Sequence, residues 1–389
     1  MVEARTRAAW AEVDLDALAH NVAVLARRAA PAALCAVVKA DAYGHGAPQV
    51  ARTAVESGAA ALAVALVDEG LELRAHGIDA PVLVLSEAVP AAAELLVRTG
   101  LGATVASRGG VEAIAAAARR VGTRGSVQVE VDTGMHRGGV SPADAPSLVE
   151  AIESEPALRL EGVWTHLAVA DGVTDDDRAY TALQLERFDA VVAALRSRPR
   201  VLHAANSAGA IAWPAARYDM VRCGIAVYGG APSDAMADGR AGEDVASAVA
   251  SLRPVLSLKA RVSSVRELDA GERPSYGRRR ALVEHGVVAT VPIGYADGVP
   301  RRLFDAGCPV LVGGRRRPLA GVVTMDQLMV DCGPASRVAP GDEVVLIGRQ
   351  EGEVISAADW ARLLGTISYE VLCRIGPRVP RVHVGEGSP

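Results

Sequence analysis

Residues 34–46 read LCAVVKADAYGHG, in which the apolar run Leu34–Val38 meets a lysine, Lys39, and then a polar segment with two glycines. A short apolar run bounded by turn residues is typical of a strand that is buried on both faces. The same pattern returns along the first part of the chain. The eight strands that it predicts are Leu34–Ala40, Ala61–Leu66, Pro81–Ser86, Leu101–Val105, Val127–Asp132, Leu160–His166, Val201–Asn206 and Asp219–Arg222.

Amphipathic stretches separate these runs, and glycine or proline marks many of the junctions, as helix ends require. The predicted helices are Pro48–Gly58, Asp68–Gly77, Pro90–Gly100, Arg108–Val121 and Asp177–Arg196. Strands that alternate with helices form a parallel sheet, and eight such units close into a (β/α)8 barrel of the TIM type. The same alternation of strands and helices also fits an open, doubly wound sheet.

The second part of the chain has a different texture. Ala231–Ser251 has little periodicity and is expected to be a connection, partly helical. We therefore expect a barrel over residues 1–245, with an N-terminal strand–helix extension, and a mostly β domain over residues 246–389. Its predicted strands are Leu256–Val265, Val287–Pro292, Pro309–Val312, Val322–Val330 and Glu343–Ile347, with a helix near Ala357–Leu364.

The composition excludes several classes of protein. A formal net charge of -5 argues against general affinity for nucleic acid. The five cysteines are odd in number and form no C-x-x-C pair, so the sequence predicts neither a disulfide framework nor a metal site. No apolar stretch is long enough to cross a membrane or to act as a secretory leader. A cytoplasmic protein is expected.

Barrel enzymes carry their sites at the C-terminal ends of the strands, which draws attention to Lys39. A lysine behind a buried apolar run loses charge readily, and such lysines form Schiff bases with carbonyl compounds. A solvated lysine at a strand end is the plain alternative. Ser207 and the backbone of Gly224 and Ile225 follow the last two strands, where barrels often bind phosphate. A lysine facing a phosphate site suggests pyridoxal phosphate, with a Schiff-base aldolase as the main rival.

The motif around Lys39 also closely resembles the cofactor-lysine motif of bacterial alanine racemases. The likeness covers essentially the whole chain, from Ala11–Leu18 to Arg378–Arg381. It implies that Lys39 and Tyr276 are the two catalytic residues and that Lys39 holds pyridoxal phosphate. The other cofactor contacts that it implies are Tyr43, His166, Asn206, Ser207, Arg222, Gly224, Ile225 and Tyr369. The implied substrate contacts are Arg137 and Met325, and the supporting or entrance residues are Glu130, Asp171, Tyr295 and Asp326.

These residue types suit racemisation, which needs an electron sink and proton carriers on both faces of a planar carbon. An ionised tyrosine requires positive neighbours, and Arg137 is a candidate. Arg222, expected opposite the pyridine nitrogen, donates hydrogen bonds but does not give up a proton, which keeps the ring a weaker electron sink. The resemblance also implies a homodimer whose sites are shared between subunits.

Two positions depart from the family pattern. Glu130 stands where many members carry a lysine, and we expect its carboxylate to pair directly with Arg137. Val322 stands where an arginine is common, so an ion pair with Asp171 at the entrance is not expected. The sequence therefore leaves two substrate ranges open: alanine alone, or a wider set of amino acids that includes serine. A non-catalytic carrier of pyridoxal phosphate and an amino-acid decarboxylase are the alternatives outside racemisation.

Overall fold

The structure is a computed structural model that describes residues 7–385. The chain forms two compact units. The barrel unit comprises Ala17–Ala42 and Gly46–Arg253, and the second unit comprises residues 7–16, Tyr43–His45 and residues 254–385. The first strand therefore groups with the C-terminal residues, and the boundary expected near residue 245 falls inside helix α11 (Glu243–Ala250).

The barrel unit contains eight parallel strands in the order β8-β7-β6-β5-β4-β3-β2-β9. Backbone hydrogen bonds from Asp219 to Leu202 (3.0 Å) and from Arg222 to Ala205 (2.9 Å) join the two end strands. The predicted barrel is confirmed, and an open sheet is excluded. The strands are β2 (Ala33–Val37), β3 (Ala61–Val64), β4 (Val82–Val84), β5 (Gly102–Val105), β6 (Gly125–Glu130), β7 (Leu158–Trp164), β8 (Val201–His203) and β9 (Met220–Cys223).

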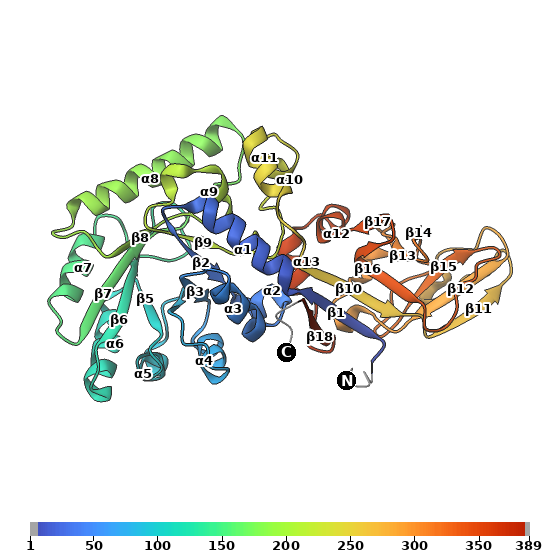
Figure 1. Ribbon diagram of the computed structural model, residues 1–389, viewed down its shortest axis with the longest axis horizontal. Helices are drawn as coiled ribbons and strands as arrows, with labels where there is room; N and C mark the ends of the chain where they lie inside the picture. The colour runs from blue at the N-terminus through green and yellow to red at the C-terminus, as the bar shows by residue number, and fades with distance from the viewer. Residues whose placement is uncertain (1–6, 386–389) are drawn as a thin grey trace. The chain divides into compact units, whose positions relative to one another are not determined.

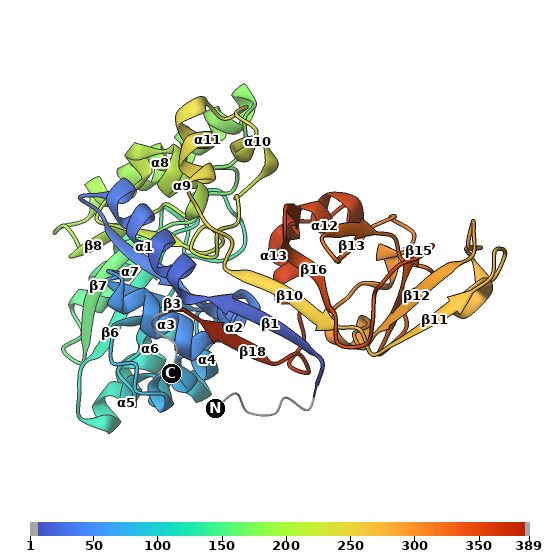
Figure 2. The ribbon, with the colours of Figure 1, turned by 45° about the vertical axis from the view of Figure 1, so that its right-hand side comes forward.

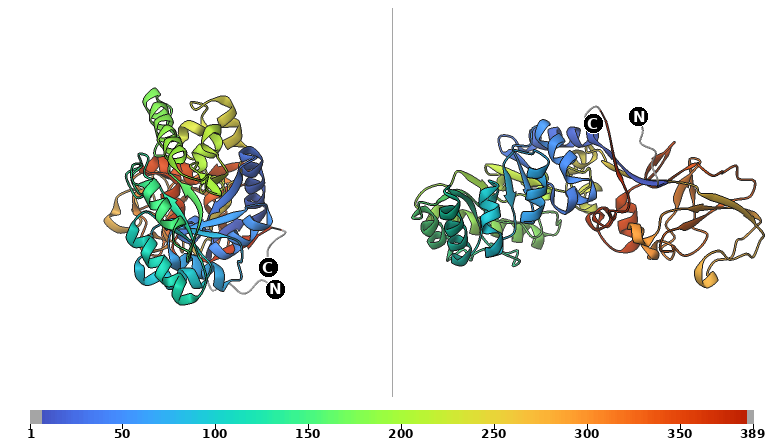
Figure 3. Two further views of the ribbon diagram at one scale, coloured as in Figure 1. Left: turned by 90° about the vertical axis from the view of Figure 1, so that its left-hand side faces the viewer. Right: turned by 90° about the horizontal axis from the view of Figure 1, so that it is seen from below.

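Helices cover the outside of these strands (Figures 1 and 3). Helix α6 (Arg108–Val121) shows why they form: Ser107 caps its first turn by accepting from Gly110 N (2.9 Å), and Gly122 ends it in the left-handed conformation. No helix of the described residues is long and apolar enough to span a membrane. The others are α1 (Leu15–Ala29), α3 (Ala47–Glu56), α4 (Val67–Ala75), η1 (Pro90–Ala92), α5 (Ala93–Arg98), α7 (Ala145–Glu153), α8 (Asp175–Ala194), α9 (Ser207–Ala212), η2 (Pro214–Ala216), α10 (Asp234–Ala237) and α11.

The second unit is mostly β, as predicted, and holds two sheets. The larger has the order β14-β13-β16-β10-β1-β18, with β17 on β16, and the smaller has the order β11-β12-β15. Figure 2 shows β1 between β10 and β18. The strands are β1 (Ala9–Asp14), β10 (Leu256–Arg261), β11 (Ser264–Leu268), β12 (Gly286–Val291), β13 (Val310–Val312), β14 (Arg315–Arg317), β15 (Leu328–Gly333), β16 (Glu343–Gln350), β17 (Glu353–Ile355) and β18 (Arg381–Val384).

Two strand predictions in this unit are wrong. Leu256–Val265 is not one strand, because the chain leaves the larger sheet after Arg261 and enters the smaller one at Ser264. The strand expected from Val322 begins only at Leu328, since the preceding residues form a loop. The predicted helix near Ala357–Leu364 is present as α12, and α13 (Ser368–Cys373) follows it.

Candidate active site

Lys39 lies just beyond the C-terminal end of β2, but the strand predicted through Ala40 ends at Val37. Lys39–Gly44 forms a single short helix, α2. Ala40, Asp41, Ala42 and Tyr43 all have φ between 52° and 54°, so this turn is left-handed. That conformation costs roughly 1–2 kcal/mol for each residue with a Cβ atom, and strain of this kind persists where the surroundings enforce it, often at functional sites.

Arg222 lies on β9, the neighbour of β2, in register with Cys35. Its side chain is buried and has only neutral hydrogen-bond acceptors around it. The guanidinium meets His203 Nδ1 at 2.6 Å, the carbonyl of Thr165 at 2.8 Å and His166 Nδ1 at 3.3 Å. Burial lowers the pKa of Arg222 to about 10, which leaves it charged at neutral pH. The barrel thus holds a buried cation on β9, the neighbour of the strand that leads to Lys39.

The two histidines beside Arg222 are neutral. A guanidinium only donates, so the Nδ1 atoms of both rings accept. Burial and then the charge of Arg222 lower the pKa of His166 to about 3 and that of His203 well below its usual value. His203 Nε2 donates to Gln128 Oε1 at 2.6 Å, which fixes the ring's tautomer. The Arg222 guanidinium also lies 4.7 Å from the ring centre of Trp164.

A cluster of donors lies at the ends of β8 and β9. Ser207 is the first residue of α9, and its buried hydroxyl accepts from Gly224 N at 2.9 Å. Asn206 caps the same helix by accepting from Gly209 N at 3.0 Å. Ile225 is buried beside Gly224. A hydroxyl and backbone N–H groups therefore lie at the strand ends where barrels often bind phosphate.

Glu130 ends β6 and is half-buried, and the direct pair expected with Arg137 does not form. These two described residues form neither a hydrogen bond nor an ion pair with each other. The Arg137 side chain is exposed, whereas the Glu130 carboxylate lies beside Gly138. Burial raises the pKa of Glu130, and the charge of Arg137 opposes that shift. Asp132 shapes the loop that carries Arg137, since its Oδ1 accepts from His136 N at 2.9 Å.

Asp171 lies in the loop after β7. Its backbone carbonyl accepts from Ser233 Oγ at 3.2 Å. Val322, where the family's arginine is missing, is buried. Its side chain faces the protein interior and contributes no charge to an entrance.

The second unit brings the segments around Tyr276, Tyr295 and Met325 together on adjacent loops. Tyr295 N donates to Thr324 O and Ala296 N to Met325 O, both at 3.0 Å. Ser275 Oγ, next to Tyr276, donates to Val322 O at 2.6 Å. The exposed fractions of Tyr276, Tyr295 and Met325 are 73%, 42% and 52%, which is unusual for large apolar or aromatic side chains.

A buried acid that the sequence analysis missed ties these loops together. Asp297 is fully buried, accepts from Gly294 N at 3.0 Å and pairs with Arg7 and Arg378. Arg378 also donates to Asp326 at 2.6 Å. In the sequence, Asp297 is marked only by its place two residues after Tyr295, which the resemblance assigns to the supporting or entrance residues.

Tyr43 and Tyr369 lie together within the second unit. Their ring centres are 6.2 Å apart, with an angle of 48° between the planes. Tyr43 is buried and Tyr369 is half-buried on α13. Arg381 Nε donates to Gly44 O at 2.9 Å, which holds the residue after Tyr43.

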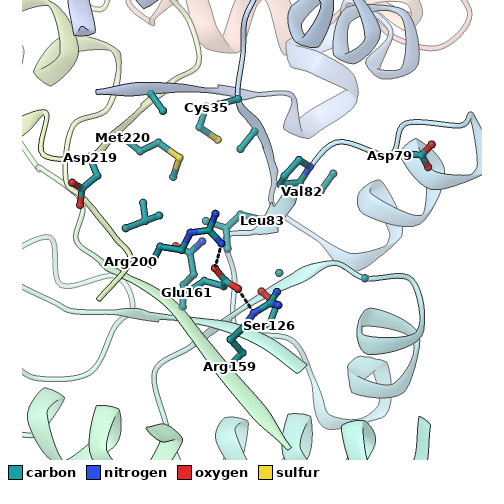
Figure 4. A pocket seen from close by; sticks show the side chains of 18 of the residues that line it. Cys35, Asp79, Val82, Leu83, Ser126, Arg159, Glu161, Arg200, Asp219 and Met220 are labelled. Carbon is teal, nitrogen blue, oxygen red and sulfur yellow. Dashed lines mark hydrogen bonds and ion pairs between the residues drawn. The ribbon is translucent and has the colours of Figure 1, made fainter. Parts of the chain in front are cut away.

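The barrel also has a cavity of about 550 Å³ at the N-terminal ends of its strands (Figure 4). Small side chains such as Ala33, Ala61 and Gly102 leave this part of the interior unfilled. At its rim, Glu161 pairs with Arg159 and Arg200. Because catalytic residues of barrels gather at the C-terminal strand ends, this cavity is not the candidate site.

Comparisons with known proteins agree with the geometry. The alanine racemase N-terminal domain model matches residues 13–232, and the C-terminal domain model matches residues 255–383. An alanine racemase from Symbiobacterium thermophilum is 46% identical over 383 residues, 98% of each chain. The solved alanine racemase from Streptomyces coelicolor A3(2) is 41% identical, with a TM-score of 0.87 over 97% of this chain and 98% of that chain. A histidine racemase from Leuconostoc mesenteroides subsp. sake is 29% identical, with a TM-score of 0.86 over 98% and 99%. The chain belongs to the alanine racemase family.

Proposed function

We propose that this protein interconverts L-alanine and D-alanine with pyridoxal phosphate as cofactor. The observation that carries the proposal is Arg222, a buried cation with neutral acceptors on the strand beside Lys39. Such a cation suits a pyridine nitrogen that accepts a hydrogen bond but stays unprotonated. Family membership agrees with this reading.

The residues of each unit fit the parts of this cofactor. Lys39 would bind its aldehyde carbon, and Ser207 with the backbone of Gly224 and Ile225 would bind its phosphate. Asn206 would orient that pocket by capping α9. The family resemblance also assigns the hydroxyl groups of Tyr43 and Tyr369 to the phosphate. His166 would lie beside the ring. When bound, the cofactor supplies the electron sink for loss of the Cα proton.

Inversion at Cα needs two proton carriers on opposite faces. We assign the Nζ atom of Lys39 to one face and the phenolic oxygen of Tyr276 to the other. A single carrier would return the proton to the face it left. Arg222 would donate to the ring without releasing a proton, which would favour rapid return of the proton to Cα over side reactions.

The substrate is a small amino acid, and alanine is our specific proposal. Arg137 and the backbone at Met325 would bind its carboxylate, with Glu130 acting on Arg137 through charge rather than direct contact. Tyr295 and Asp326, which neighbour Met325, would line the entrance with Asp171. The structural likeness to a histidine racemase makes side-chain size the property to test.

We infer that the working unit is a homodimer in which each site uses Lys39 of one chain and Tyr276 of the other. Tyr276, Tyr295 and Met325 are all well exposed on adjacent loops of the second unit, as expected for residues that complete a partner's site. The reaction needs Tyr276 at Cα and away from bulk water. A second copy of this chain would provide that setting.

We also propose a cytoplasmic location. Among the described residues, the buried cysteines Cys35, Cys223, Cys308 and Cys332 form no disulfide. Burial raises the pKa of the Cys35 and Cys223 thiols to about 12, which keeps them protonated and inert. Four buried cysteines that remain thiols suit a reducing compartment.

The test is racemisation of L-alanine with added pyridoxal phosphate, compared with L-serine, L-lysine and L-histidine. The proposal expects the highest kcat/KM for alanine, and a higher value for another substrate would refute the assignment. Mixing a Lys39→Ala chain with a Tyr276→Phe chain tests the shared site. Partial recovery of activity supports it, and no recovery after verified subunit exchange contradicts it.

A further inference from the structure

We propose that Glu69 and Arg381 are positioning residues that hold the left-handed turn Ala40–Tyr43 and so fix the direction of Lys39. This inference rests on the proposed role of Lys39 as the cofactor-binding residue. Neither residue belongs to the motifs that place the cofactor, and neither is expected to touch it. Their role follows from what the turn needs in order to persist.

The turn is held against the preference of its own residues. Glycine enters the left-handed region freely and single asparagine or aspartate residues do so at times, but a run of such residues is rare. Ala40, Asp41, Ala42 and Tyr43 include two alanines and a tyrosine, all with φ above 50°. Contacts outside the turn must therefore hold its backbone.

Glu69 holds the first residue of the turn. Its Oε1 atom accepts from Ala40 N at 2.6 Å, directly after Lys39. Its Oε2 atom accepts from Ala65 N at 2.7 Å and from Leu66 N at 3.0 Å, which fixes the carboxylate at the end of β3 and the start of α4. One half-buried carboxylate thus joins the residue after Lys39 to a rigid element of the barrel unit.

Asp41 closes the middle of the turn within the same unit. Its side chain accepts from Ala47 N at 2.7 Å, and its carbonyl accepts from Gly46 N at 3.0 Å. These bonds tie the turn to the first residues of α3. They are local, whereas the N–H of Ala40 and the carbonyl of Gly44, on either side of the turn's middle, are bound by Glu69 and Arg381.

Arg381 holds Gly44, the residue that follows the turn, within the second unit. Its Nε donates to Gly44 O at 2.9 Å, while its Nη1 donates to both Gly376 O at 2.6 Å and Val379 O at 2.7 Å. Gly44 fits closely there, since a Cβ atom at this position would lie 2.6 Å from the carbonyl oxygen of Leu372. The carbonyl of Gly44 is thereby fixed.

The first experiment uses Glu69→Ala, with Asp359→Ala as its matched control. Asp359 occupies the same third position of a helix, accepts from Ser356 N at 2.7 Å and caps α12, so its loss reports on capping alone. Amide hydrogen exchange in the cofactor-free protein is the main measurement. We expect exchange at residues 40–46 to rise at least tenfold in Glu69→Ala and to stay unchanged in Asp359→Ala.

Cofactor affinity and trapping give two further measurements. Glu69→Ala and Arg381→Ala should each weaken pyridoxal phosphate binding about tenfold and slow borohydride trapping at Lys39. Arg381→Lys should recover part of the loss, because it keeps a donor. Unchanged exchange and unchanged affinity in both alanine variants would overturn the proposal.

A glycine rescue separates strain from capping. Ala40 is exposed with φ of 54°, so Ala40→Gly removes the Cβ penalty without opening a cavity. Added to Glu69→Ala, it should restore cofactor affinity at least threefold, and no restoration would refute the role of strain. If the wild type binds no pyridoxal phosphate, the proposed function fails, whereas the exchange experiment still tests how the turn is held.

Discussion

Arg222 donates to Nδ1 of His203 over 2.6 Å, and His203 in turn donates to Gln128. Because a guanidinium carries no acceptor, this bond exists only while the His203 ring is neutral. The chain of three side chains therefore keeps a single positive charge, on Arg222, inside the barrel. Protonation of His203 would bring two buried cations together.

The first prediction concerns pH. The folded pKa of His203 lies well below 6.5 and that of His166 is about 3, so the unfolded chain binds protons first as pH falls. Stability is thus present above pH 6.5 and is lost as pH falls from about 6.5 towards 3. Between pH 7.5 and 5.5 each such histidine should remove about 1.4 kcal/mol from the free energy of unfolding. Urea unfolding at both pH values measures this loss of stability. The loss in His203→Asn should be about 1.4 kcal/mol smaller than in the wild type. An identical loss in the variant would contradict the prediction.

The second prediction concerns Glu130. Burial raises its folded pKa above the unfolded value, so its ionised form is disfavoured in the folded protein. The stability of the wild type therefore falls as pH rises from the unfolded pKa of Glu130, about 4.5, through its higher folded pKa. Glu130→Gln cannot ionise, and it should be more stable than the wild type at pH 8, with a smaller difference at pH 4.5. Denaturant unfolding at the two pH values decides it, and a less stable variant at pH 8 would be the contrary result.

The third prediction concerns the close approach of two entrance loops. A Cβ atom on Gly294 would lie 2.3 Å from Thr324 O and 2.4 Å from Met325 O, both of them backbone atoms. Gly294→Ala should lower the free energy of unfolding by about 1–3 kcal/mol and kcat/KM by about tenfold, because the loops must move apart. Gly352→Ala is the control, since nothing lies within 4 Å of its added Cβ. Equal effects of the two substitutions on kcat/KM would argue against the loop contact.

The fourth prediction concerns the cavity of the barrel. Ala61 and Ala63 lie two residues apart on β3 and point to the same face, but only Ala61 lines the cavity. Ala61→Val should change the free energy of unfolding by less than about 0.5 kcal/mol, while Ala63→Val should cost about 1–3 kcal/mol through overpacking. Thermal and urea unfolding compare them. A larger cost for Ala61→Val would mean that the cavity is not free to accept a methyl group.

Much of the fold could be predicted because buried parallel strands are nearly continuous apolar runs. Each of the eight barrel strands overlaps its predicted run, although several end earlier, and helix α6 has its predicted bounds. The error at Leu256–Val265 has a physical cause: its β-forming residues continue through Val262, while the change of sheet depends on partners distant in the sequence. Helix α7 was missed, although Pro146 in its first turn is a usual start signal.

The site was predicted unevenly. Lys39 and the donors after the last two strands follow from the rule that barrel sites lie at strand ends. The left-handed turn could not be predicted, because alanine and tyrosine have no preference for it and the contacts that enforce it come from Glu69 and Arg381. The role of Asp297 depends in the same way on Arg7 and Arg378, which are far from it in the sequence.

The position of β1 has a consequence for how the protein is made. This strand is synthesised before the barrel strands, yet its neighbours β10 and β18 begin only at Leu256 and Arg381. The barrel strands follow one another in the chain and pair as they emerge, whereas both edges of β1 wait for residues synthesised much later. A nascent chain stalled before Arg381 would carry one edge of β1 open to pairing with another molecule. Strand β18 therefore decides whether that edge of β1 is covered.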